Sequence, residues 1–288
     1  MVRDAGVLVD RTQMLSGRVR AALAALLTFL AGASPAQANG WPQPAMGPSH
    51  SGDPEVIFTF DDGPHPIITP RLLDMLQAHD IHAVFFWVGW RLIRTPEAAG
   101  LLVERAIREG HIVGNHTINH AQLCDVPEDI GAREIEGARA LFEQAAQMPV
   151  VWFRSPYGAR CPKLERMLTD RGLRNFHWDL DPQEWRSYGP RKTIDYVIRN
   201  LTYLDQGQRA VLLLHDTKVS TLRAFPKIID WIVAENKKRT AMGRRPIRIV
   251  SAYQLAIEQL DRQAVDWAVG AAEEAGGSMA RALAATVP

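Results

Sequence analysis

The stretch FTFDDGPHP, Phe58–Pro66, places two adjacent carboxylates directly after an apolar run. A glycine and two prolines follow directly, so Asp61 and Asp62 fit an ordinary surface turn. Two neighbouring acids at the end of a buried strand also fit a site in which each carboxylate has its own task. This stretch alone leaves both interpretations open.

Short apolar runs alternate with longer amphipathic segments along most of the chain. The expected strands cover residues 56–60, 83–88, 111–116, 150–154, 175–180, 210–215 and 247–251. Expected helices include 69–79, 128–146 and 222–238, the first with Thr69 as its cap and Pro70 at its first position. Strands that alternate with helices, and that are apolar throughout, indicate a parallel sheet covered on both faces. The pattern predicts an α/β fold, a closed or nearly closed (β/α) barrel with about seven parallel strands.

The first 38 residues resemble a secretory signal peptide. Arg18 and Arg20 precede the apolar run 21–32, and the small residues 36–38 offer a cleavage site. The run is short for a membrane span, so we expect an exported protein, periplasmic or secreted, without stable membrane insertion after cleavage. An uncleaved N-terminal anchor is the alternative. Met14 offers a second start position.

The remaining 250 residues suit a single barrel domain. We expect an irregular lead-in at 39–53, a catalytic domain at 54–262 and an Ala-rich tail at 263–288. The net charge is +1, and residues 236–248 form the only basic run. A solvated helix end explains that run, so no nucleic-acid partner is predicted. The oligomeric state stays open.

Polar residues collect where the expected strands end. These positions are Asp61 and Asp62, residues 116–120, residues 154–158, residues 179–185, and His215 with Asp216. In (β/α) barrels the reactive groups lie at the carboxyl ends of the strands. The convergence of five strand ends predicts one site at one rim.

His116 and His120 are four residues apart, a spacing that puts both imidazoles on one side of a helical turn. Two such histidines alone are more often a solvated helix face. With Asp62 from another strand end, they make a two-His, one-carboxylate set with an open position, as catalytic zinc sites use. Iron(II) oxygenases use the same set, so the ligand types leave the metal open.

Five motifs appear in a fixed order: TFDDG (59–63), HTINH (116–120), RSPYG (154–158), DPQEW (181–185) and LLH (213–215). In this order they resemble the polysaccharide deacetylases of carbohydrate esterase family four, over about residues 54–260. The resemblance implies a distorted (β/α) barrel. It also implies a metal-dependent hydrolase of linear amides that removes N-acetyl groups from N-acetylglucosamine units of a glycan and releases acetate. The implied metal is zinc, with Co²⁺ or another divalent transition metal as the alternative.

The resemblance also implies roles for single residues. Asp61 would be the general base, paired with Arg154, and Asp62 would bind the metal with His116 and His120. His215 would be the general acid that protonates the leaving amine.

Three further residues would contact the substrate. The backbone N–H of Tyr157 would bind the oxyanion, Leu213 would contact the acetyl methyl group, and Trp185 would stack on a sugar ring. Leu213 and Trp185 are alternatively plain core residues. His65 is the unassigned histidine that we expect to line the cleft.

The fourth motif departs from the family pattern D-x-x-D-W, because Glu184 stands where an aspartate is expected. The resemblance implies that this carboxylate supports His215, accepts its ring N–H and raises its pKa. Asp181 and Asp216 are close in sequence and are the alternatives for that role.

The two cysteines, Cys124 and Cys161, each follow one of the motifs, and both are expected at the rim of the barrel. Export allows a disulfide between them, with two free thiols as the alternative.

Two other functions stay open: an O-acetyl esterase acting on xylan, and a non-catalytic glycan-binding protein. The glycan itself is not identified by the motifs.

Overall fold

The computed structural model describes residues 49, 51–186, 189–251, 254–255 and 257–258. The predicted signal peptide (1–38), the tail (263–288) and most of the lead-in (39–53) lie outside these described residues. Among the described residues, no helix combines the length and the apolar character that a bilayer span requires.

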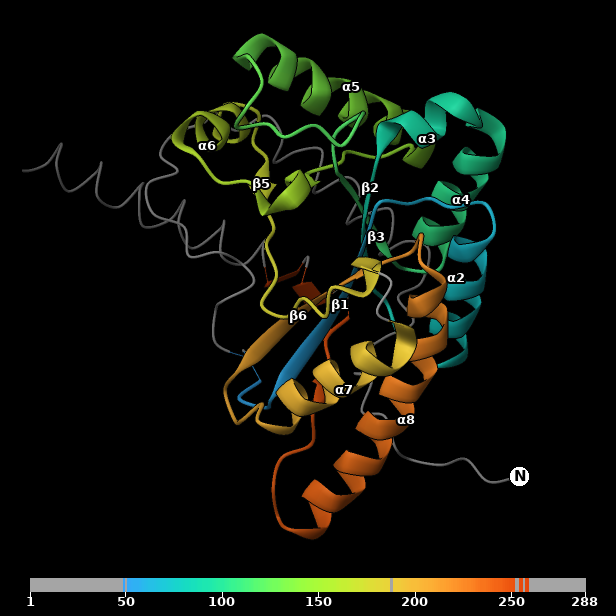
Figure 1. Ribbon diagram of the computed structural model, residues 1–288, viewed down its shortest axis with the longest axis vertical. Coiled ribbons are helices and arrows are strands. Elements are labelled where there is room, and N and C mark those ends of the chain that lie inside the picture. The colour runs from blue at the N-terminus through green and yellow to red at the C-terminus, as the bar shows by residue number, and fades with distance from the viewer. Residues whose placement is uncertain (1–48, 50, 187–188, 252–253, 256, 259–288) are drawn as a thin grey trace, which may run out of the picture.

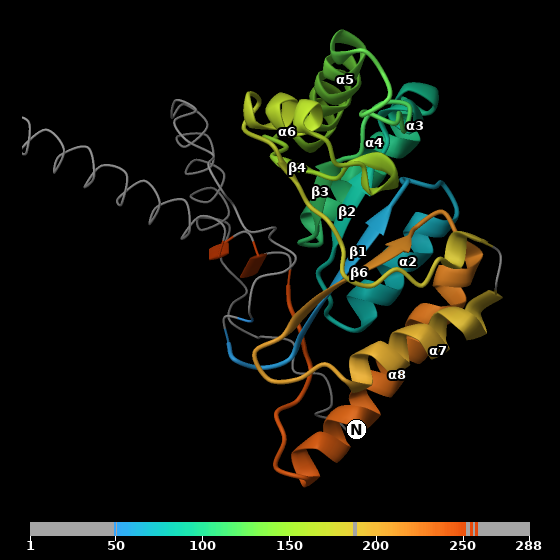
Figure 2. The ribbon, with the colours of Figure 1, turned by 60° about the vertical axis from the view of Figure 1, so that its left-hand side comes forward.

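The centre of the fold is a 7-stranded sheet in which every pairing is parallel. The strand order is β5-β4-β3-β2-β1-β6, and β7 pairs with the beginning of β1. The sheet curls, as Figures 1 and 2 show, and confirms the predicted α/β class and the distorted barrel. Its strands are β1 (Glu55–Asp61), β2 (Val84–Trp87), β3 (Ile112–Asn115), β4 (Trp152–Phe153), β5 (Arg174–Asn175), β6 (Arg209–His215) and β7 (Arg248–Ile249).

The segment predicted as a strand at 175–180 connects the two ends of this sheet. It begins in β5 beside β4. Leu180 then forms an isolated parallel bridge to Leu212, and the Leu213 N–H donates to the Leu180 carbonyl at 2.9 Å. The prediction of one continuous strand was therefore wrong, because the segment pairs with β4 at its start and with β6 at its end.

Helices cover the outer face of the sheet. Helices α2, α7 and α8 lie beside β1 and β6, whereas α3, α5 and α6 lie towards β3–β5 (Figures 1 and 2). The predicted helix 128–146 is confirmed at both ends as α5, and α8 extends the predicted 222–238 in both directions. The helices are α2 (Ile68–Ala78), α3 (Gly89–Arg94), α4 (Pro96–Arg108), α5 (Glu128–Ala146), α6 (Pro162–Thr169), α7 (Gly189–Thr202) and α8 (Val219–Ala241). Two short 3₁₀ turns, η2 (Pro156–Gly158) and η3 (Glu184–Arg186), follow β4 and β5.

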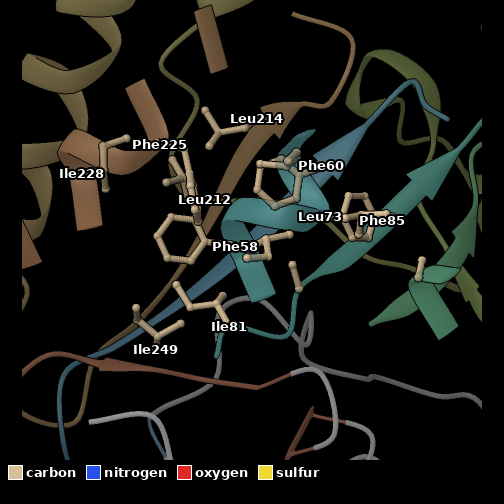
Figure 3. Close-up of a cluster of buried hydrophobic side chains, with 14 of the residues drawn as sticks. Phe58, Phe60, Leu73, Ile81, Phe85, Leu212, Leu214, Phe225, Ile228 and Ile249 are labelled. Carbon is tan, nitrogen blue, oxygen red and sulfur yellow. The ribbon is translucent and has the colours of Figure 1, made fainter. Parts of the chain in front are cut away.

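The alternation of side chains along β1 separates core from site. Phe58 and Phe60 pack outward against the helices, and the Phe58 and Phe225 ring centroids are 5.3 Å apart (Figure 3). Ile57 instead packs with Phe86 inside the barrel. Because side chains alternate between the two faces of a strand, Thr59 and Asp61 share the inner face with Ile57.

Thr69 does not cap α2, so that prediction was wrong. The helix begins one residue earlier, at Ile68. His65 Nδ1 accepts hydrogen bonds from the backbone N–H groups of Ile67 (3.1 Å) and Ile68 (3.2 Å) at the start of the helix. The Thr69 hydroxyl is used differently: it donates to Asp216 Oδ2 at 2.5 Å and accepts from the His65 N–H at 2.7 Å.

The Cys124–Cys161 disulfide is present, which confirms the bridged alternative. Its Cα atoms are 6.1 Å apart, and it joins the segment after β3 to the residue that precedes α6. The bond therefore ties together the two loops that carry the HTINH and RSPYG motifs.

Candidate active site

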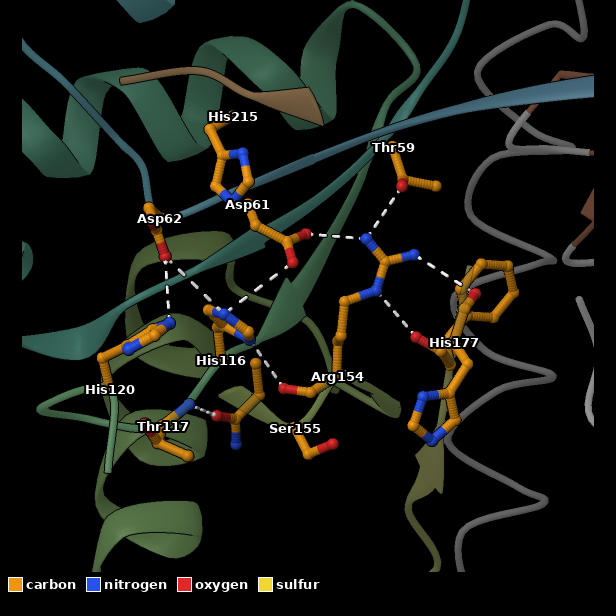
Figure 4. Close-up of polar contacts among 12 residues, drawn as sticks. Thr59, Asp61, Asp62, His116, Thr117, His120, Arg154, Ser155, His177 and His215 are labelled. Carbon is orange, nitrogen blue, oxygen red and sulfur yellow. Dashed lines mark hydrogen bonds and ion pairs between the residues drawn. The ribbon is translucent and has the colours of Figure 1, made fainter. Parts of the chain in front are cut away.

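Asp61 and Arg154 form a buried ion pair inside the barrel (Figure 4). Asp61 ends β1 and Arg154 follows β4, and both side chains are almost fully buried. One terminal guanidinium nitrogen of Arg154 donates to Asp61 Oδ1 and to the Thr59 hydroxyl, each at 2.8 Å. Arg154 Nε donates to the Phe176 carbonyl at 2.7 Å. The predicted contact between Asp61 and Arg154 is therefore present, and Thr59, the first residue of the TFDDG motif, is a further support to which the motifs assigned no role.

Burial raises the pKa of Asp61 above its ordinary value, while the charge and hydrogen bond of Arg154 lower it. The net direction is upward, so Arg154 opposes the effect of burial without cancelling it. A carboxyl group with a raised pKa is a stronger base than an ordinary aspartate.

His116 is buried, and its ring has a defined orientation. Its Nδ1 lies 2.7 Å from the Arg154 carbonyl oxygen, which can only accept a hydrogen bond. Nδ1 therefore carries the proton, and the lone pair of Nε2 faces Asp62. Burial lowers the pKa of His116 to about 3, so the ring is neutral near pH 7.

Asp62, His116 and His120 converge on one point. Asp62 Oδ1 lies 3.6 Å from His116 Nε2 and 3.3 Å from His120 Nε2. The ligand atoms of the three residues lie within 4.8 Å of one another. In the described part of the chain, Asp62 Oδ1 is buried without a hydrogen-bond partner. A carboxylate oxygen and two imidazole nitrogens around one point fit a divalent metal ion.

The two histidines do not lie on a helical turn, so the predicted reason for their convergence was wrong. Residues 116–120 form an irregular loop, in which Thr117 and His120 have φ values of 67° and 58°. Asn115 Oδ1 accepts the Thr117 N–H at 2.8 Å. From α5, the Glu134 carboxylate accepts the Asn119 backbone N–H at 2.7 Å. Polar residues at buried positions of β3 and α5 were the sequence signal for these supports.

Arg91 is a further residue that the motifs did not reveal. It lies in α3, and its Nε donates to the backbone carbonyl of Asp62 at 2.7 Å. Asp62 itself has a φ of 73°, in the left-handed region that non-glycine residues rarely adopt. Arg91 therefore helps to hold the metal-site carboxylate in this backbone conformation.

Glu184 is the carboxylate that contacts His215. Glu184 Oε1 lies 2.9 Å from His215 Nδ1 and accepts the His215 backbone N–H at 2.6 Å. Asp181 instead accepts the Gln183 N–H, and Asp216 accepts from the Trp87 indole N–H at 2.9 Å. The structure thus selects Glu184 from the three candidates, despite its extra methylene.

The pKa of His215 is raised to about 9. Burial alone would lower it, but the hydrogen bond and charge of Glu184, with the Asp62 and Asp61 carboxylates, outweigh burial. His215 is therefore protonated at neutral pH, as a general acid requires.

Two adjoining hollows open beside these groups. The first is lined by Asp62 and His120 together with His65, which confirms that His65 lines the cleft. The second contains Glu184 and Trp185, whose side chain is 42% exposed.

The other two predicted substrate contacts, Leu213 and Tyr157, differ in their exposure to solvent. Leu213 is buried in β6. Tyr157 is exposed, has a φ of 60°, and its ring centroid lies 4.5 Å from that of His120. The structure therefore brings Tyr157 to the metal site.

The sequence profile described as polysaccharide deacetylase matches residues 49–176. A peptidoglycan-N-acetylglucosamine deacetylase of Bacillus cereus is 31% identical over 179 residues, covering 60% of this chain and 79% of that protein. A chitooligosaccharide deacetylase of Bradyrhizobium is 34% identical over 168 residues, covering 58% of this chain and 72% of that protein. The solved structure of a peptidoglycan deacetylase from Bacillus subtilis is 25% identical, with a TM-score of 0.59. The match covers 75% of this chain and 96% of that protein chain.

Proposed function

The chain belongs to the polysaccharide deacetylase family, and on this premise we propose that it removes N-acetyl groups from N-acetylglucosamine units of a glycan with the help of a divalent metal ion. The observation that carries the proposal is the convergence of Asp62, His116 and His120 beside the Asp61–Arg154 pair and His215. The names of the two relatives support N-acetylglucosamine as the sugar.

Asp62 Oδ1 and the Nε2 atoms of His116 and His120 would hold the ion, and zinc is the metal that we propose. When bound, such an ion polarises the acetyl carbonyl and lowers the pKa of a bound water. Co²⁺ is the alternative, because the same ligands accept other divalent transition metals.

The protein's own residues would move the protons. Asp61 would take a proton from the attacking water, with Arg154 holding its carboxylate in place through Oδ1. Asp61 Oδ2 points towards the metal site, at 3.8 Å from His116 Nε2. His215 would then give its proton to the departing nitrogen, so that the amide and water become acetate and an amine.

The remaining predicted residues would position the substrate. Tyr157 would offer its backbone N–H to the developing oxyanion, and its place beside His120 supports this role. Leu213 would contact the acetyl methyl group, and the exposed Trp185 would stack on a neighbouring sugar.

We also propose that the protein is exported, as residues 1–38 suggest. The Cys124–Cys161 disulfide supports this proposal, because such bonds persist mainly in oxidising compartments.

The test is acetate release from N-acetylglucosamine oligomers, with and without a chelator. We expect the chelator to abolish release, and zinc or cobalt to restore it. His120→Ala should lose both activity and tight zinc binding measured by titration calorimetry, whereas His79→Ala, at the residue that follows α2, should lose neither. Full activity of His120→Ala in chelator would refute the metal assignment. Release from acetylated xylan alone would identify an O-acetyl esterase, and binding without release would identify a glycan-binding protein.

A further inference from the structure

Glu134 of α5 is a buried carboxylate that the proposed proton transfers do not use. It is 8% exposed, and among the described residues it forms no ion pair with a cation. Both of its carboxylate oxygens are occupied by one residue instead. The Asn119 backbone N–H donates to Oε2 and the Asn119 side-chain amide donates to Oε1, each at 2.7 Å. A buried carboxylate without a cationic partner is costly, so packing alone does not explain Glu134.

Glu134 also holds the residue that precedes Asn119. Its backbone carbonyl accepts the Ile118 N–H at 3.1 Å. One residue of α5 therefore fixes two successive residues of the loop 116–120, one through its backbone and one through its side chain. The next residue of the loop is His120, one of the three proposed metal ligands.

The two histidine ligands are supported in different ways. The His116 ring is buried, and its Nδ1 donates to the Arg154 carbonyl at 2.7 Å. The His120 side chain is 27% exposed, faces Asp62 and contacts the exposed Tyr157 ring. Within the described part of the chain, the His120 ring donates no such hydrogen bond to a backbone carbonyl. The position of the His120 ring therefore depends on the backbone that carries it.

That backbone has a conformation that needs support. Thr117 and His120, both labelled in Figure 4, have φ values of 67° and 58°, which are unfavourable for residues with a Cβ. The Thr117 hydroxyl is buried without a hydrogen-bond partner among the described residues, so it does not hold the loop. Asn115 Oδ1 holds the beginning of the loop through the Thr117 N–H, and Glu134 holds its end.

We propose that Glu134 is a positioning residue that fixes the backbone before His120 and thereby sets the affinity of the metal site. The inference rests on the proposed metal-dependent function, and it concerns a residue that touches neither the ion nor the substrate. A ligand that is already held in place has no ordering cost when the ion binds. Without the two bonds to Asn119, the loop can relax towards ordinary φ values, and the ion must then reorder His120 at the expense of affinity.

The test measures zinc affinity, because a residue that only stabilises the fold would not change this affinity in a folded protein. Metal-free protein competes for zinc with a chromophoric chelator, and thermal unfolding in chelator gives the folded fraction at the assay temperature. We expect Glu134→Ala to raise the Kd for zinc by about 10- to 100-fold. Glu136→Ala is the matched control. It removes a carboxylate from the same helix that is 59% exposed and paired with Arg171, and it should leave the Kd unchanged.

Two milder variants separate the hydrogen bonds from the charge. Glu134→Gln keeps an acceptor for the Asn119 N–H, and the exposed Asn119 amide can turn over to accept from the glutamine. This variant should therefore keep a Kd close to that of the wild type. Asn119→Ala removes the side-chain bond alone and should raise the Kd by less than Glu134→Ala does.

A wild-type Kd in folded Glu134→Ala would overturn the inference. If Glu134→Ala does not fold, a wild-type Kd in Asn119→Ala would overturn it in the same way. An equal rise of the Kd in Glu136→Ala or in Glu134→Gln would also overturn it, because the effect would then follow the charge of α5 and not the contact with the loop. A wild-type protein that binds no zinc would instead contradict the proposed metal site.

Discussion

Replacing Glu184 with glutamine removes the negative charge beside His215 while keeping the shape of the Glu184 side chain. The oxygen that lies 2.9 Å from His215 Nδ1 also accepts the His215 backbone N–H, and a glutamine oxygen can accept both bonds. The Thr221 hydroxyl, 3.2 Å from the same oxygen, would keep its acceptor as well. The variant therefore tests the charge of Glu184 rather than its packing.

The expected effect follows from the pKa of His215, which is about 9 with Glu184 in place. Burial lowers this pKa and Glu184 raises it, so loss of the charge should move it towards the ordinary 6.5. A raised histidine pKa keeps the ring protonated until the pH rises through that value. At pH 8 the protonated fraction would fall from about 90% to about 3% if the pKa reached 6.5, a loss of about 30-fold in rate. At pH 6 the loss would be less than about twofold.

The assay is the pH dependence of kcat for acetate release, measured from about pH 5 to about pH 10. Asp181→Asn is the matched control, because Asp181 is a neighbouring carboxylate that accepts the Gln183 N–H instead of a bond from the ring. We expect the alkaline limb of Glu184→Gln to lie at lower pH than that of Asp181→Asn. If the Glu184→Gln profile superimposes on the wild-type profile, Glu184 does not set the protonation of His215.

Two further predictions concern the scaffold of the site. Gly63→Ala should lower the free energy of unfolding by about 1–3 kcal/mol in denaturant titrations, because a Cβ at this position would overlap the buried Asp216 carboxylate. Gly100→Ala, in open space on α4, should instead raise that free energy by about 0.5–1 kcal/mol, and equal effects of the two would contradict the packing argument. Cys124→Ser should lose about 3–4 kcal/mol, since the bond to Cys161 closes a loop with a sequence separation of 37. Wild-type protein in reductant should show the same loss, and an unchanged unfolding midpoint would argue against this contribution.

The sequence predicted the elements whose patterns are local. Helix α5 was predicted at both ends, and β1 was predicted to within one residue at each end. The sequence also predicted correctly that Asp62, His116 and His120 lie together, because each follows a strand and parallel strands place their carboxyl ends at one rim.

What the sequence did not predict depends on contacts between distant segments. Thr69 looked like a helix cap, but its hydroxyl bonds Asp216, which is 147 residues away. His116 and His120 converge through a loop in the left-handed region, held by Glu134 of α5, and not through a helical turn. Side-chain partners of this kind override local propensity and have no local signal.

Arg154 shows how the same interior serves both the fold and the site. Its guanidinium is fully buried inside the barrel and lies 4.3 Å from the centre of the Phe86 ring, which belongs to an apolar cluster. A buried charge is costly unless it is paired, and apolar residues often replace buried ion pairs without loss of stability. Packing alone therefore gives no reason for an arginine here. The Arg154 guanidinium donates hydrogen bonds to Asp61 and to the Phe176 carbonyl, and the Arg154 carbonyl accepts one from His116 Nδ1. One residue therefore connects the proposed base with a proposed metal ligand. The position of Arg154 is thus explained by the geometry that it imposes on Asp61 and His116 and not by the stability of the barrel.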